Sequence, residues 1–140
     1  MSIRNHNIDT IAPVLASFKI SQSDGVDDLK DADIGTAVTL SDNDEIGPIT
    51  NGGLFLGKLI SLTLSDKDDG LRVATVQVGG VCRIATAATY PEIGDRVIGA
   101  GNGAVKQAPA LTGYDPAGGA VARGTVLSVN GTQDCIVLLN

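Results

Sequence analysis

The chain has 140 residues, of which 43% are hydrophobic and 3% aromatic, and it contains no tryptophan. This length is typical of one domain with its own core, which must be built from aliphatic side chains. The formal net charge is -6 and the 10 basic residues are scattered, which speaks against nucleic-acid binding, because that affinity comes from clustered Lys and Arg. The 18 glycines between short apolar runs favour all-β structure with many turns.

No stretch reaches the ~20 apolar residues that cross a membrane, and Asp9 and Pro13 interrupt the apolar stretch near the start. We therefore expect no secretion signal and no membrane segment, and a protein that stays in the cytoplasm where it is made. Cys82 and Cys135 each lie inside an apolar strand pattern, which favours two buried thiols. A disulfide between them stays open at this point.

Residues 1–33 differ in composition from the rest. Apolar residues recur around Pro13, and a linker rich in Asp, Ser and Gly follows. The apolar spacing fits one short helical face, and an extended arm fits equally well. We interpret 1–33 as an N-terminal arm with an acidic linker and 34–140 as the body. The arm either docks on a neighbouring subunit or folds back over its own barrel. Its candidate anchors are Ile8, Ile11, Val14, Leu15 and Phe18.

The body is organised around residues 54–84, which are predicted to form two long strands joined by a polar turn. Ile60, Leu62 and Leu64 alternate with polar residues, which predicts a strand with one buried face. The Gly pair at 79–80 predicts a bend or bulge in the second strand. The further predicted strands are 34–40, 97–98 with 104–107, 121–129 and 133–139, and 41–53 is predicted to be a loop.

This spacing of strands and turns predicts an all-β fold. We expect a single small β-barrel or β-sandwich of about seven strands, with an extended or partly helical N-terminal arm. Asn130-Gly131 is the strongest hairpin pattern in the chain, and it precedes the last predicted strand.

Few residues suggest chemistry. The acidic runs at 42–45 and 66–70 lack the ligand spacing of an EF-hand calcium loop. The single histidine, His6, lies in the arm, so a Ser or Cys nucleophile finds no adjacent base. The run 99–104 loosely resembles a dinucleotide-binding loop but leads into no helix, which favours a hairpin turn. We therefore expect a protein that is not an enzyme and needs no metal or cofactor.

Four arginines interrupt strand patterns that are otherwise apolar or made of small residues. On the outer face of a sheet they could pair with turn carboxylates of a neighbouring subunit, or they could be ordinary solvent-facing residues, because exposed ion pairs contribute little. The candidate inter-subunit charge contacts are Arg72, Arg83, Arg96 and Arg123.

The order of strands and glycines over 34–139 resembles the small capsid cement, or decoration, proteins of tailed bacteriophages. The resemblance is carried by GKLISLTLSDKDDGLRVATVQVGG, then GDRVIGAGNGAVK, then RGTVLSV before an apolar C-terminus. It implies a structural virion protein on the capsid surface, made in the bacterial host cytoplasm. Such a protein links neighbouring major capsid proteins against the pressure of packaged DNA, as a homotrimer in preference to a dimer, without contacting nucleic acid or membrane.

Two other classes stay open, namely a small β-barrel component of a phage tail or baseplate and a carbohydrate-binding module. Sugar binding relies on exposed aromatic rings, and the chain has only two Tyr and two Phe. If the cement interpretation holds, a chain without residues 1–20 should keep a folded body and bind heads poorly.

Overall fold

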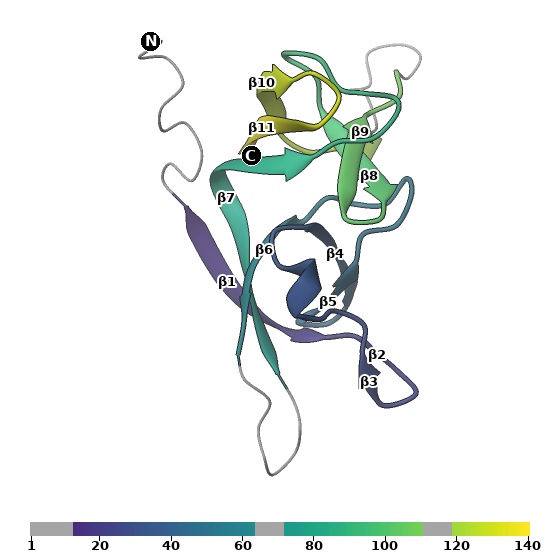
Figure 1. Ribbon diagram of the computed structural model, residues 1–140, viewed down its shortest axis with the longest axis vertical. Coiled ribbons are helices and arrows are strands. Elements are labelled where there is room, and N and C mark those ends of the chain that lie inside the picture. Colours follow the sequence, from purple (N-terminus) through teal and green to yellow (C-terminus); the bar gives the residue numbers. More distant parts are fainter. Residues whose placement is uncertain (1–12, 64–71, 111–118) are drawn as a thin grey trace.

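The computed structural model describes residues 13–63, 72–110 and 119–140, which form the all-β fold expected from the sequence (Figure 1). The strands are β1 (Val14–Ile20), β2 (Gln22–Ser23), β3 (Val26–Asp27), β4 (Ala37–Asp42), β5 (Glu45–Pro48), β6 (Gly57–Leu62), β7 (Val73–Ala85), β8 (Val97–Gly101), β9 (Ala104–Gln107), β10 (Thr125–Asn130) and β11 (Asp134–Leu139). Two short 3₁₀ turns, η2 (Asp31–Asp33) and η3 (Gly119–Val121), are the helical elements of this part of the chain.

Five strands close into a small barrel. They follow one another in the order β1-β5-β4-β6-β7, and β7 also pairs with β1, which completes the ring. Neighbouring strands are antiparallel except for β1 and β5, which run parallel where Lys19 and Ile20 face Glu45 and Ile46. Aliphatic side chains fill the interior: Ile20, Leu29, Val38, Ile46, Leu59, Ala74 and Val76.

The long strand β7 leaves the barrel and enters a second sheet, in the order β7-β11-β10 (Figure 1). Gly79 still faces Val14 of β1, whereas Gly80, with φ +84°, faces Leu139 of β11. The predicted bend at this glycine pair is confirmed. A second core lies under this sheet and the β8–β9 hairpin: Ala37, Ile49, Phe55, Cys82, Ile84, Val97, Val105, Val126, Cys135, Val137 and Leu139.

A buried glutamine holds the bend of β7. The side chain of Gln77 is fully buried, and its Nε2 donates to the carbonyl oxygens of Gly79 at 3.1 Å and Val81 at 3.0 Å. The two carbonyl groups lie where β7 changes its pairing from β1 to β11. The Gln77 side chain thus supplies the hydrogen-bond donor that these main-chain oxygens need at a buried bend.

Three details of the predicted strands were wrong. The strand expected over 121–129 begins only at Thr125, because Val121 lies in the 3₁₀ turn η3. Strand β5 lies inside the stretch that the sequence predicts as a loop, because its four residues include a Gly and a Pro and show no alternation. Ile60 was expected on the buried face, but a register shift between Leu59 and Ser61 inserts it as an extra residue. Leu59 is therefore fully buried and Ile60 half-buried. Leu64 lies outside the described residues.

Residues 14–20, expected to belong to an arm, form a strand of the chain's own barrel. They pair antiparallel with β7 from Val14 to Lys19. Residue 29, in the expected linker, is a buried leucine of the barrel core. The barrel thus begins before the expected boundary at residue 33. For residues 14–20, the structure therefore agrees with the alternative of an extended segment that folds back onto its own barrel. Ile8 and Ile11 lie outside the described residues. Removing 1–20 would therefore delete a barrel strand.

Candidate interaction surface

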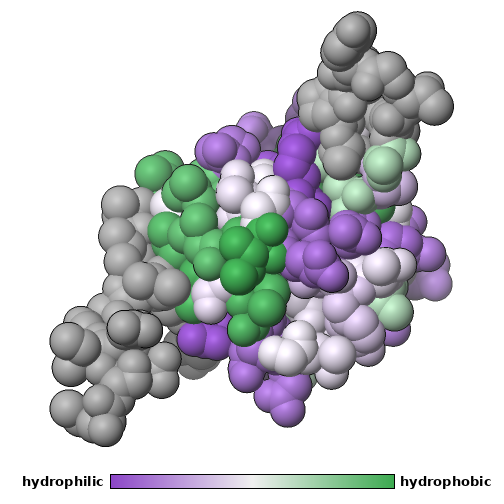
Figure 2. Space-filling view, turned by 90° about the horizontal axis from the view of Figure 1, so that it is seen from above, coloured by the Kyte–Doolittle hydropathy of each residue, from purple (hydrophilic) through white to green (hydrophobic). Residues whose placement is uncertain are grey.

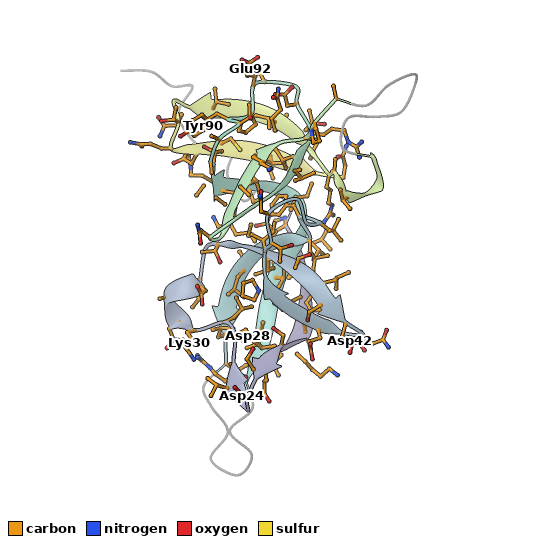
Figure 3. All side chains as sticks on the ribbon, turned by 90° about the vertical axis from the view of Figure 1, so that its right-hand side faces the viewer. Asp24, Asp28, Lys30, Asp42, Tyr90 and Glu92 are labelled. Atoms are coloured by element: carbon orange, nitrogen blue, oxygen red, sulfur yellow. The ribbon has the colours of Figure 1, made fainter. Side chains whose placement is uncertain are left out.

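The two ends of the molecule carry different side chains. Figure 3 places Tyr90 and Glu92 at the end that holds β10 and β11, whereas Asp24, Asp28 and Asp42 lie toward the opposite end. The first end exposes apolar side chains on β10 and on the connection beside it, whereas most of the described carboxylates lie toward the second end, which also exposes Val26 and Leu40. We call them the apolar end and the acidic end.

The apolar end comprises four exposed side chains on β10 or on the connection from β7 to β8. Their exposed fractions are 42% for Tyr90, 71% for Ile93, 41% for Leu127 and 39% for Val129. The connection lies against β10, because Gly94 N donates to Val126 O at 2.8 Å and Val126 N donates to Asp95 O at 2.9 Å. Figure 2, which views this end of the molecule, shows apolar side chains gathered on its surface.

The exposure of Leu127 and Val129 follows from the position of β10 in the sheet. β10 is the outermost strand of the order β7-β11-β10, and its register shifts between Val126 and Ser128, so that Leu127 is an extra residue. Edge strands usually carry charges that prevent further association, and a contiguous exposed apolar surface marks an interaction site. The sequence analysis did not identify the apolar end, because the apolar pattern of a strand does not show whether the strand lies at the edge of its sheet.

The acidic end is built from the β2–β3 hairpin, η2 and the β4–β5 turn. Its acidic residues are Asp24, Asp27, Asp28, Asp31, Asp33, Asp42, Asp44 and Glu45. Asp28 accepts hydrogen bonds from the hydroxyls of Ser21 and Ser23, each at 2.7 Å. These bonds favour the ionised form and lower the pKa of the Asp28 carboxyl. Within the described ranges, no group of three or more His, Cys, Asp or Glu is arranged to hold a metal ion.

A hollow of about 490 Å³ lies where the barrel meets the turn between β8 and β9. Its lining includes Asp33, Thr36, Ile49 and Asn102. Two polar side chains of this lining are bonded locally, since Asp33 Oδ2 accepts from Lys30 N at 2.7 Å and Thr36 Oγ1 donates to Asp33 O at 2.6 Å. The hollow therefore presents no ready set of acid, base or nucleophile.

Three of the four candidate arginines bond to groups of their own chain near the surface. Arg72 Nη2 lies 2.6 Å from Asp31 Oδ1, and Arg83 Nη1 lies 2.7 Å from Asp134 Oδ1. Arg96 Nη2 donates to a main-chain oxygen, that of Ala122, at 2.6 Å. Contacts with another subunit stay a prediction, and they would have to compete with these intrachain partners.

Arg123 has a different position, at the junction of the barrel and the second sheet. Its guanidinium donates to the carbonyl oxygens of Leu56 and Val78, and its backbone pairs with Val97. Burial lowers the pKa of this guanidinium. Leu56 precedes β6 and Val78 precedes the bend of β7, so this arginine ties together segments of the two halves of the fold.

Cys82 and Cys135 are buried in the same core, and each is present as a thiol and not as half of a disulfide. Burial, followed by the proximity of Cys82, raises the pKa of Cys135 to about 12. Since the thiolate is the nucleophilic form, this thiol is inert at neutral pH. Both cysteines therefore act as small core residues.

Comparison with known proteins returns no matching family model, no matching curated protein and no matching solved structure. Among the described residues, no helix has the length and apolar character needed to cross a membrane. A function for this chain has to be argued from its own surface.

Proposed function

We propose that the chain is a structural protein of a bacteriophage virion, a cement protein that binds the outer capsid surface and links neighbouring major capsid proteins. The observation that carries this proposal is the apolar end, where an edge strand exposes Leu127 and Val129 and the connection bonded to that strand exposes Tyr90 and Ile93. The strand and glycine order that resembles cement proteins supports it from the sequence. In this proposal the apolar end meets the capsid and the acidic end faces solvent.

The size of the apolar end limits how tightly one copy can bind. Fully burying a large apolar side chain contributes about 1.5–3 kcal/mol, and these four are already partly buried, so about 1 kcal/mol each remains. The sum of about 4 kcal/mol corresponds to a dissociation constant of about 1 mM. Useful binding therefore needs several linked contacts. A homotrimer that spans a junction between capsid proteins would supply them through effective concentration.

The start of β1 offers a second contact. Val14 and Leu15 are 57% and 52% exposed, whereas Phe18 of the same strand packs against the barrel core. Val14 and Leu15 are therefore the described members of the candidate arm that remain available to a partner. Binding that requires neighbouring capsid proteins stabilises the assembled shell by mass action, because the dissociated proteins lack the site.

The proposal is tested by cosedimentation with shells assembled from the major capsid protein encoded in the same genome. Leu127→Asp places a charge in the apolar end, and Asp42→Asn is the matched control at the acidic end. We expect Leu127→Asp to weaken binding at least about tenfold, because burying a charge costs more than 1.4 kcal/mol. Asp42→Asn should bind as the wild type does. Equal binding by both variants would contradict the assignment of the apolar end.

Light scattering on a sizing column tests the proposed homotrimer and the competing class. A closed trimer supports the linking role. A large ring would instead favour a component of a phage tail or baseplate.

A further inference from the structure

We propose that Asn130, the last residue of β10, is the preferred site of spontaneous deamidation in the folded protein. The chain contains three Asn-Gly pairs, and in each pair the glycine lies in a described turn: Asn51-Gly52, Asn102-Gly103 and Asn130-Gly131. The pairs share the same local chemistry, so the fold decides which of them reacts.

The reaction needs only water. The main-chain nitrogen that follows the asparagine loses its proton and attacks the side-chain carbonyl carbon, the C–N bond to the side-chain nitrogen breaks, and ammonia leaves. Water then opens the resulting succinimide at one of its two carbonyl carbons and gives aspartate or isoaspartate. Glycine favours the attack because it has no side chain to hinder the approaching nitrogen.

At Asn51 both reacting groups are held by other partners. The Gly52 nitrogen donates to Gly99 O at 2.8 Å, and the Asn51 side-chain oxygen accepts from Lys106 Nζ at 2.7 Å. The Gly52 nitrogen could attack only after its hydrogen bond to Gly99 O had broken. This pair is therefore protected.

At Asn102 the backbone is fixed within the tight β8–β9 turn. Asn102 and Gly103 have φ of 51° and 75°, and Gly103 O accepts from Ala37 N at 2.9 Å. A Cβ atom on Gly103 would lie 2.7 Å from the Thr36 Cβ atom, so this glycine packs closely against its neighbour. The peptide after Asn102 has little freedom to rotate toward the side chain.

At Asn130 neither restraint is present. Asn130 and Gly131 are both exposed, and a Cβ atom on Gly131 would meet nothing within 4 Å. Across the described part of the chain, the Gly131 nitrogen donates no backbone hydrogen bond, and the Asn130 amide makes one long contact of 3.4 Å with Gln133 Oε1. The Gly131 main-chain nitrogen and the Asn130 side-chain carbonyl carbon are therefore free to approach each other.

Reaction at Asn130 would change the hairpin that carries the apolar end. Asn130 and Asp134 are cross-strand partners, and Asp134 already pairs with Arg83. A new carboxylate would face Asp134 directly, and like charges in opposite positions destabilise a strand pair. The isoaspartate product also lengthens the main chain of the turn. An aged sample should therefore have a weaker β10–β11 hairpin at low salt.

Peptide mapping tests the proposal, because trypsin places the three pairs on separate peptides: 31–58, 97–106 and 124–140. The folded protein is incubated in mildly alkaline buffer, and mass spectrometry follows the conversion of amide to acid. We expect peptide 124–140 to convert at least about fivefold faster than the other two, which is about 1 kcal/mol of activation free energy, the scale of one hydrogen bond.

Two controls separate the fold from intrinsic reactivity. In guanidinium chloride the three peptides should convert at similar rates, and Asn130→Gln should abolish conversion of 124–140 without changing the other two. The proposal is overturned if Asn51 or Asn102 reacts as fast as Asn130 in the folded chain. It is also overturned if the preference for Asn130 persists unchanged after unfolding.

Discussion

Replacing Ile20 with alanine tests whether β1 is a strand of the barrel. Ile20 is 6% exposed in the barrel core, whereas Leu15, on the same strand, is 52% exposed. Ile20→Ala removes three buried carbon groups at about 0.8 kcal/mol each and leaves a cavity, so we expect a loss of about 2–5 kcal/mol. A domain of this size is stable by about 5–15 kcal/mol, so the loss is a large share of the total. The matched control Leu15→Ala should change stability by about 0.5 kcal/mol or less.

Urea unfolding followed by far-ultraviolet circular dichroism measures both variants. The slopes of the transitions should stay equal to that of the wild type, and only the midpoint of Ile20→Ala should fall. If Ile20→Ala costs no more than Leu15→Ala, residues 14–20 are a detached arm and the closed barrel is wrong.

Two further predictions concern polar groups. Gln77→Met leaves the carbonyl oxygens of Gly79 and Val81 without their buried donor. Because Gln77 Oε1 itself has no partner among the described residues, the net loss in the free energy of unfolding, measured in urea, should be about 1–2 kcal/mol. Unchanged stability would refute the role of Gln77 at the bend. The lowered pKa of Asp28 means that its contribution is complete above its ordinary pKa of 3.8 and is lost as pH falls through the lower value. Asp28→Asn should therefore be less stable than the wild type at neutral pH, and the difference should vanish in strong acid; a difference that is independent of pH would contradict this.

Much of the fold follows from local sequence patterns. The turns that follow Asn130 and Asn102 each contain a glycine with positive φ, Gly131 and Gly103, and both turns join antiparallel strands. The glycine pair at 79–80 marks the place where β7 bends between its two sets of partners. Turn chemistry and the period of two are local, so the sequence reveals them.

The remaining features depend on contacts between distant segments. Ile60 and Leu127 occupy positions where the strand register shifts, and a shift depends on the partner strand. Strand β1 was assigned to an arm although Ala16, Phe18 and Ile20 alternate with exposed residues, because helical spacing overlaps with this alternation. The apolar end depends on β10 being the outermost strand, which follows from the topology of the whole sheet.

The most direct test of the proposed function is cosedimentation of the full-length wild-type chain with shells of the major capsid protein from the same genome. The proposal predicts saturable binding to assembled shells, at a fixed ratio to the capsid protein, and no binding to the dissociated protein. A wild-type chain that stays in the supernatant at every shell concentration would contradict a role as a capsid cement protein.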